Sequence, residues 1–155
     1  MSVIFNNAKV IISTSTADGA NDISASVTKV TLERKYDLHE NTHMGQSAKS
    51  RIAGLEEWSM TIDVLQSFST GDASVESQIN IDKLLSTLID INTTGKSFMV
   101  HVRPKNTARS SDNPEYKGLV VLESYSPMDG EVGDLLKMTI PLQSADNLTR
   151  SVSTS

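Results

Sequence analysis

One stretch of this sequence alternates apolar and polar side chains so regularly that it constrains the fold more than any other feature. Every second residue from Trp58 to Val64 is apolar, namely Trp58, Met60, Ile62 and Val64, and Phe68 continues the same parity. The alternate positions hold Ser59, Thr61 and Asp63. Because successive side chains of a strand point to opposite faces, the pattern predicts a half-buried strand. We expect Trp58, the lone tryptophan, to anchor the core on the buried face.

Shorter alternations elsewhere predict further strands. They run over residues 98–102, 136–142, 8–12 and 30–38, and the parity change before Val30 predicts a bulge or bend near Thr28. In the first of these strands, His101 falls on the polar face, where we expect an exposed histidine. Pro141 cannot donate a ladder hydrogen bond, which favours an edge position for the last strand.

One helix is predicted within this series of strands. Its apolar stripe has the spacing i, i+3, i+4, i+7 and consists of Ile81, Leu84, Leu85 and Leu88. A mainly β chain with one α-helix indicates a small β-sandwich or barrel. A length of 155 residues suits one domain, which we assign to residues 1–150, followed by a flexible carboxy-terminal tail at residues 151–155.

Three stretches lack any periodicity and are predicted as loops. They extend from Ser13 to Asp22, from His39 to Ala53 and from Pro104 to Glu115. Loops of this length are uncommon in compact domains unless they are functional or ordered by a partner. Apolar residues make up only 37% of the chain, so we also expect a thin core that gains burial from neighbouring subunits.

Charge and composition exclude several classes of function. The net charge is −5, and no basic cluster is longer than Arg34-Lys35, which disfavours tight binding of nucleic acid. The chain has no cysteine, which excludes a disulfide framework, a thiolate zinc site and a cysteine nucleophile. Neither a signal peptide pattern nor an apolar run long enough to cross a bilayer is present, so we expect no membrane insertion.

The pentapeptide from His39 to His43 matches the zinc protease pattern HExxH, with His39, Glu40 and His43 as the metal and catalytic residues. That chemistry needs a helix that holds both imidazoles on one face. Here the segment follows a strand pattern, contains the weak helix formers Asn41 and Thr42, and is followed by Gly45. We therefore interpret the match as chance and predict no metal site.

No other residue set indicates catalysis. Glu56 and Glu57 are adjacent, so an extended backbone would point them to opposite faces. The glycines form no phosphate-binding loop, and no serine lies in a nucleophile elbow. We predict that the chain is not an enzyme and binds no cofactor.

The order of elements is similar to that of one family of assembling proteins. A long strand opens at Gly54-Leu55-Glu56-Glu57-Trp58, a helix and a strand ending in Val102-Arg103-Pro104 follow, and another strand opens at Asn113-Pro114-Glu115-Tyr116-Lys117-Gly118. A turn from Pro127 to Gly133 precedes the final strand and a polar end at Asn147-Leu148-Thr149-Arg150. From Gly54 to Arg150 this order resembles the major tail, or tail tube, proteins of long-tailed bacteriophages.

The resemblance implies a structural virion protein. Tail tube subunits look like β-sandwiches flanked by a helix, close into hexameric rings and stack into the tube that conducts genome DNA. The implied partners are further copies of the chain, a tape measure protein, tail terminator or tip proteins, and double-stranded DNA in non-specific passage. The implied location is the phage tail in the virion, after synthesis in the host bacterial cytoplasm.

Two sets of site residues follow from this resemblance. We expect contacts between subunits or stacked rings at Leu38, His43, Met44, Leu55 and Pro141. Negative potential in the channel, which would let DNA slide without being held, is expected from some of Asp63, Glu115, Glu123, Glu131 and Asp134.

Three alternatives stay open at this point. One is a β-sandwich adhesion or tail-tip module, although the loops at residues 13–22 and 104–114 hold no aromatic side chain for such binding. Another is the inner tube of a contractile injection or type VI secretion system, which uses the same fold. The third is the HExxH hydrolase.

Overall fold

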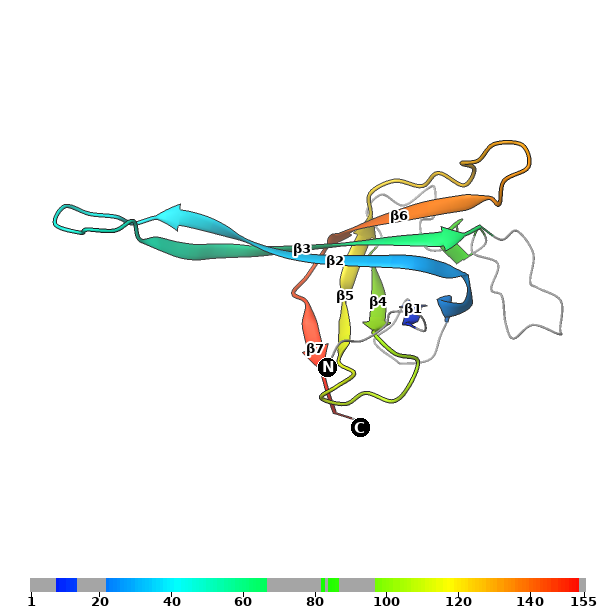
Figure 1. Ribbon diagram of the computed structural model, residues 1–155, viewed down its shortest axis with the longest axis horizontal. Coiled ribbons are helices and arrows are strands. Elements are labelled where there is room, and N and C mark those ends of the chain that lie inside the picture. The colour runs from blue at the N-terminus through cyan, green and yellow to red at the C-terminus, as the bar shows by residue number, and fades with distance from the viewer. Residues whose placement is uncertain (1–7, 14–21, 67–81, 83, 87–96, 154–155) are drawn as a thin grey trace.

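The protein is mainly β, as predicted. The structure is a computed structural model, and it describes residues 8–13, 22–66, 82, 84–86 and 97–153 (Figure 1). Its elements are β1 (Lys9–Ser13), the 3-10 helix η1 (Ser24–Ser26), β2 (Val27–Glu40), β3 (Arg51–Leu65), β4 (Phe98–Arg103), β5 (Glu115–Leu122), β6 (Lys137–Ser144) and β7 (Thr149–Ser151). Ser151, the first residue of the predicted flexible tail, is therefore a strand residue.

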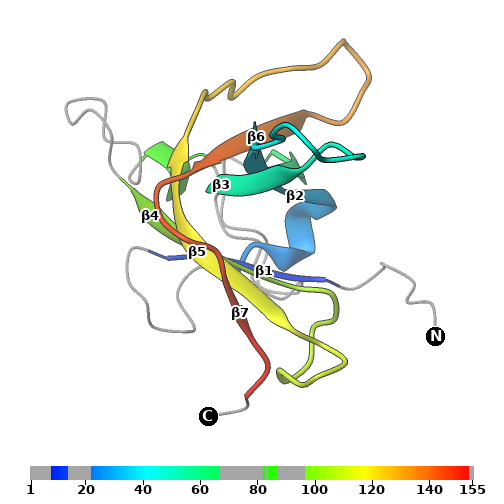
Figure 2. The ribbon, with the colours of Figure 1, turned by 90° about the vertical axis from the view of Figure 1, so that its left-hand side faces the viewer.

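The strands form one antiparallel, seven-stranded sheet that folds over on itself. Its order is β1-β4-β5-β6-β3-β2, and β7 pairs with β5 beside this path. Figure 1 shows β2, β3 and β6 running along the long axis of the molecule, while β4, β5 and β7 run across it. Figure 2, turned by a quarter, shows the two groups as separate layers. The core fills the space between them.

The predicted alternation of β3 is confirmed in the core. Trp58, Met60, Ile62 and Val64 are each no more than 1% exposed, whereas Phe68 lies outside the described residues. The Trp58 indole N–H donates a hydrogen bond of 2.6 Å to the carbonyl oxygen of Asp146. The indole ring also covers Gly118 of β5, where an added Cβ would lie 2.4 Å from Trp58 Cζ2. Close contact between β3 and β5 therefore requires a residue without a side chain at position 118.

Two sequence predictions about strand geometry have opposite outcomes. The bulge near Thr28 is confirmed, because the β2–β3 register shifts between Val27 and Lys29. The edge position predicted from Pro141 is wrong, since β6 lies between β3 and β5. The β5–β6 pairing ends at Leu122 and Leu142, one residue before Pro141 is reached. The backbone N–H that Pro141 lacks therefore lies just past the last ladder pair, where its absence is tolerated. There the Glu123 N–H donates instead to the Pro141 carbonyl.

The described part of the predicted helix comprises residues 82 and 84–86, which are helical. Leu85 is fully buried in the core, and Leu84 packs against it. Ile81 and Leu88, the ends of the predicted stripe, lie outside the described residues. Tyr125 donates a hydrogen bond to Asp82. Burial, followed by this hydrogen bond, raises the pKa of Tyr125.

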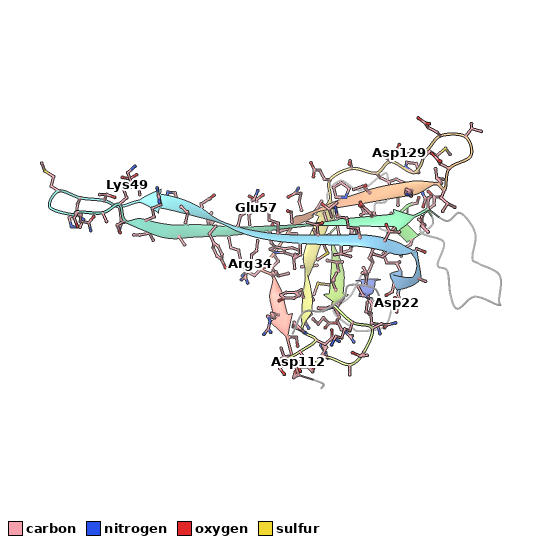
Figure 3. All side chains as sticks on the ribbon, viewed as in Figure 1. Asp22, Arg34, Lys49, Glu57, Asp112 and Asp129 are labelled. Carbon is pink, nitrogen blue, oxygen red and sulfur yellow. The ribbon has the colours of Figure 1, made fainter. Side chains whose placement is uncertain are left out.

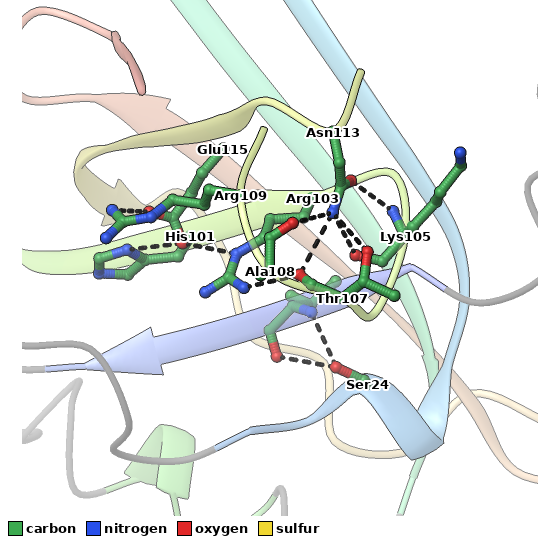
Figure 4. Close-up of polar contacts among 10 residues, drawn as sticks. Ser24, His101, Arg103, Lys105, Thr107, Ala108, Arg109, Asn113 and Glu115 are labelled. Carbon is green, nitrogen blue, oxygen red and sulfur yellow. Dashed lines mark hydrogen bonds and ion pairs between the residues drawn. The ribbon is translucent and has the colours of Figure 1, made fainter. Parts of the chain in front are cut away.

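A buried charge cluster corrects the predictions for His101 and Glu115. His101 is 2% exposed and Glu115 has no exposed surface. Glu115 accepts from Arg103 Nε at 3.0 Å and from Arg109 Nη1 at 2.9 Å, and His101 Nδ1 lies 3.7 Å away (Figure 4). The prediction treated the polar face of β4 as open to water. The connection after β4 instead folds back and brings Arg109 over that face.

The connection from β4 to β5 is organised by one side chain, that of Asn113. Its Oδ1 accepts from the Lys105 N–H at 2.9 Å, and its Nδ2 lies within 3.2 Å of the Lys105, Thr107 and Ala108 carbonyl oxygens. Asn113 is 2% exposed (Figure 4). The loop predicted from Pro104 to Glu115 is thus correct except at Glu115, which begins β5. It is a fixed connection held from within the chain.

The other two predicted loops differ from the structure or lie beyond it. The stretch from His39 to Ala53 is a loop over residues 41–50, but its two ends are strand, because β2 continues to Glu40 and β3 begins at Arg51. The stretch from Ser13 to Asp22 is described only at its ends, where Ser13 ends β1 and Asp22 bridges to Ile11. Among the described residues, no helix is long and apolar enough to span a membrane.

Candidate assembly surface

The outer half of the β2–β3 hairpin extends far from the rest of the molecule. We call residues 34–57 the arm. Side chains are exposed along nearly all of it, and the first buried residue on β3 is Trp58. Figure 1 shows the arm reaching out along the long axis with no other strand beside it. A two-stranded ribbon of this kind has little stability alone in water, so its role is to be sought in contacts outside the subunit.

The root of the arm is fixed by an ion pair on the core-facing side. Arg34 Nε donates to Glu56 Oε1, and Arg34 Nη2 donates to Glu56 Oε2 at 3.1 Å. The guanidinium carbon also lies 5.8 Å from the ring centroid of Tyr36, within the range of a cation–π contact. The hydrogen bond from Arg34 holds the pKa of Glu56 below its ordinary value. These contacts orient the ribbon where it leaves the body.

The arm exposes large apolar side chains on both of its faces. Exposure is 46% for Tyr36, 65% for Leu38, 55% for Ile52, 81% for Leu55 and 101% for Met44. Register places Leu38 opposite Ala53, on the same face as Tyr36 and the core, and places Ile52 opposite His39 on the other face. Large apolar side chains that stay exposed on both faces of a projecting ribbon indicate an interaction site.

A second bulge redirects the strand in the middle of the arm. The register shifts between Tyr36 and Leu38, so Gly54 and Leu55 together oppose the single residue Asp37. A Cβ on Gly54 would lie 2.8 Å from His39 Nε2, so the imidazole occupies the space that a side chain would need. The bulge thus keeps the apolar residues Leu38 and Leu55 at the same level of the ribbon but on opposite faces.

The tip of the arm, residues 41–51, ends in a tight turn. The Gln46 N–H donates to the His43 carbonyl at 3.3 Å, and Gly45 has a φ of +93°. Positive φ at the third position is typical of a type II turn and favours glycine. Below it, the Asn41 N–H donates to the Ser50 carbonyl at 3.0 Å. The turn holds Met44 at the outermost point.

The HExxH pentapeptide does not form the helix that its chemistry requires. His39 and Glu40 are the last residues of β2, and His43 lies in the turn. Adjacent residues of a strand point to opposite faces, so His39 and Glu40 diverge. In the parts of the chain that the structure describes, no three His, Asp or Glu side chains could hold a metal ion together.

A second surface is the face of β2, β3 and β6 that points away from the core. Cross-strand register sets its side chains in rows, one with Lys29, Asp63 and Thr139, the next with Thr31, Thr61 and Pro141, and a third with Glu33, Ser59 and Gln143. Asp63 Oδ1 accepts from Thr139 Oγ1 at 2.9 Å, and Glu123 Oε2 accepts from Gln143 Nε2 at 2.9 Å. This open face is rich in hydroxyl and amide groups, and its lysine Lys29 lies across from Asp63 in the register.

The predicted acidic residues therefore fall in three different places. Asp63 lies on the open face, and Glu123 lies beside it through Gln143. Glu131 and Asp134 are exposed in the long connection between β5 and β6. Glu115 was wrongly included, because its carboxylate is buried between two arginines and cannot present charge to a channel.

Three structural comparisons give this arrangement a context. The SPP1 tail tube superposes with a TM-score of 0.69 at 11% identity, covering 99% of this chain and 81% of that one. A chain of the native gene transfer agent virion gives 0.59 at 12% identity, with 92% and 95% covered. A chain of the anti-feeding prophage baseplate gives 0.63 at 9% identity, with 97% and 96% covered.

The chain has the tail tube fold. The similarity covers nearly the whole chain, including the amino-terminal third, which the sequence resemblance did not reach. By sequence, the chain matches no protein-family model and no curated protein. The resemblance seen in the order of strands and turns is thus confirmed at the level of the fold.

Four of the five predicted contact residues lie on the candidate assembly surface. Leu38, Met44 and Leu55 are exposed on the arm, and His43 is exposed beside the turn, so these contacts stay a prediction. Pro141 instead lies on the open face of the body. Tyr36 and Ile52 were missed. The sequence did offer a signal for Ile52. It lies close to Leu55 in a stretch that is otherwise rich in serine, lysine and glutamate, and neither residue fits the buried face of a predicted strand.

Proposed function

We propose that this chain is the subunit of a tail tube, that it closes into hexameric rings, and that the rings stack into a conduit for double-stranded DNA. Support comes from the tail tube fold shared with the SPP1 tail tube. A tail of the gene transfer agent was refined with C6 symmetry, and the anti-feeding prophage baseplate is described as 6-fold symmetrised. The sixfold symmetry of these two assemblies favours six copies per ring.

The observation that carries the proposal is the arm with its exposed apolar side chains. Full burial of a leucine side chain contributes about 1.5–3 kcal/mol, so leaving Leu38, Leu55 and Met44 in water forgoes a large stabilisation. A two-stranded ribbon also has unpaired backbone groups on its edges. Both deficits are removed when the arm packs on neighbouring subunits.

The experiment removes the apolar surface without touching the core. We expect Leu38→Ser with Leu55→Ser to abolish rings and tubes in negative-stain images and to leave a slow-sedimenting species with unchanged circular dichroism. Val152→Ser, which also replaces an exposed apolar residue but lies outside the arm, is the matched control and should assemble normally. Normal tubes from the arm variant would contradict the role given to the arm.

We further propose that the open face of β2, β3 and β6 lines the channel. Its lysines Lys29 and Lys35 lie across from the acidic residues Asp63 and Glu57, so the face offers no concentrated positive charge for phosphates to bind. Glu123, beside Gln143, adds negative charge. DNA can then pass without being held.

Reversal of these charges tests the lining. Asp63→Lys with Glu123→Lys should leave tubes intact and slow or block DNA delivery by particles that contain them, because lysines in the channel attract phosphates. Delivery at the unaltered rate would rule out this face as the channel wall.

On this proposal the chain resides in the tail of a virion after synthesis in the host cytoplasm. Its further partners would be a tape measure protein inside the tube and terminator or tip proteins at its ends. No catalytic step and no cofactor is assigned to it.

A second candidate is a ring component of a contractile system, favoured by the similarity to the anti-feeding prophage baseplate. Such a component could form single rings rather than long tubes. Imaging the purified protein separates the two, since stacked tubes support the tail tube and isolated rings support the baseplate.

A further inference from the structure

The two ends of the long axis carry opposite charge. Figure 3 shows Lys49 on the tip of the arm at one end, and Asp129 on the connection between β5 and β6 at the other end. We call this connection, residues 123–136, the acidic loop. Because the two segments lie at opposite ends, they cannot meet within one subunit.

The tip is basic and has one apolar residue at its outermost point. Residues 41–51 include Lys49 and Arg51 and no aspartate or glutamate, and the nearest acidic residue, Glu40, lies opposite Arg51 at the base of the tip. Met44 is fully exposed at 101%. Hydrogen bonds within the turn fix the backbone, so a binding partner would not have to order this segment.

The acidic loop has the complementary composition. Residues 123–136 include Glu123, Asp129, Glu131 and Asp134 and no lysine or arginine. The same loop exposes large apolar side chains, with Met128 at 76%, Val132 at 107% and Leu135 at 71%. Apolar groups at the centre with charged groups around them is the usual composition of a protein interface.

The acidic loop is also held in place by the body. The Gln66 N–H donates to the Leu136 carbonyl at 2.9 Å, and Gln66 Nε2 donates to the Pro127 carbonyl at 3.0 Å. At the far end, the Asp134 N–H donates to the Glu131 carbonyl at 3.1 Å, and Gly133 has a φ of +96°. The loop therefore presents its acidic and apolar side chains on a defined turn.

We propose that the tip of one copy docks on the acidic loop of the next copy along the stack. Met44 packs on Met128, Val132 and Leu135, while Lys49 and Arg51 face Asp129, Glu131 and Asp134. This inference rests on the proposed tube. A contact between two different surfaces is heterologous, and it forms a ring if its rotation closes and an open stack if it does not. The position of the two surfaces at opposite ends of the long axis favours the open stack. Glu131 and Asp134 thus belong to the stacking contact and not to the channel wall.

The apolar and charged groups contribute differently. The apolar side chains supply most of the affinity, and the charges at the rim select the partner surface and orient it. Exposed charge pairs are screened over about 8 Å at physiological ionic strength, so added salt should shorten the tubes.

Charge reversal with compensation tests the pairing. Lys49→Glu with Arg51→Glu makes the tip acidic, and Asp129→Lys with Glu131→Lys makes the loop basic. We expect each pair alone to raise the protein concentration needed for tube growth by about tenfold, and the four changes together to restore it. The control is Lys105→Glu with Arg150→Glu, which makes the same change in net charge at exposed residues outside both segments and should not alter growth.

The outcomes separate this inference from the proposed function. If the wild type forms tubes and either reversed variant grows tubes equally well, the docking is overturned, but the proposal that the chain is a tube subunit is not. Failure of the fourfold variant to recover would overturn the pairing of these two surfaces in the same way. Absence of rings and tubes from the wild type, with sedimentation as a monomer, would overturn both.

Discussion

The contact between Trp58 on β3 and Gly118 on β5 joins the two layers of the sheet. The indole is 1% exposed, donates its N–H to Asp146 and lies against the backbone of position 118. The sequence predicted the burial of Trp58 from its parity. It did not predict the contact with Gly118, because a glycine gives no periodic signal and its partner is far away in the chain.

Gly118→Ala should be costly. The added Cβ would lie 2.4 Å from Trp58 Cζ2, so the indole must shift, and we expect a loss of about 1–3 kcal/mol in the free energy of unfolding. Denaturant titration followed by Trp58 fluorescence measures it. Gly130→Ala is the control, since its Cβ would lie 3.5 Å from the nearest atom and should change stability little. Equal stability of both variants would disprove the contact.

Glu115 differs most from its prediction, because it was expected in the channel and is buried instead. Acidic residues are usually exposed, and nothing local distinguishes this one. The informative feature was its position across a connection from Arg103, since antiparallel neighbours of opposite charge form cross-strand pairs. The structure adds His101, from β4 itself, and Arg109, which comes from the returning connection and could not be anticipated without its path.

Glu115→Gln should destabilise the protein by about 3–5 kcal/mol, because it leaves two arginine side chains without their buried counter-charge. Thermal and denaturant unfolding measure this loss. Glu123→Gln, at an exposed residue, should change stability by no more than about 0.5 kcal/mol. A stable Glu115→Gln protein would show that the cluster contributes little.

At the level of elements, the arm marks the limit of prediction from sequence. Alternation predicted the core strands well because one face of each is buried and the other is not. In the arm both faces of the hairpin are exposed, so the period-two signal disappears, and the strand ends at residues 39–40 and 51–53 were predicted as part of the loop that joins them. If a strand becomes half-buried only after assembly, its pattern of apolar and polar residues depends on the partner surface. That surface cannot be derived from the sequence of one chain.

The ion pair at the root of the arm gives a pH-dependent prediction. Arg34 lowers the pKa of Glu56 below its ordinary 4.5. A lowered folded-state pKa means that the stabilisation is present above pH 4.5 and is lost as the pH falls through the lowered value. In a carboxyl NMR titration, Glu56 should titrate below its ordinary value, and Arg34→Gln should return it there. An identical pKa in both proteins would exclude the pair.

For the whole molecule, the distribution of exposed apolar residues is the main finding. They gather on the arm and on the connection between β5 and β6, at opposite ends of the long axis, while the body between them has a closed core. The mainly β class and the family resemblance could be predicted from the order of strands and turns. The separation of these two surfaces could not, because it depends on how far the β2–β3 hairpin projects.

The most direct test of the tube proposal is electron microscopy of the purified wild-type chain over a range of concentrations, paired with analytical ultracentrifugation. We predict hollow tubes of stacked six-fold rings that become longer as concentration rises. A chain that sediments as a monomer and shows no rings at the highest attainable concentration would contradict the account.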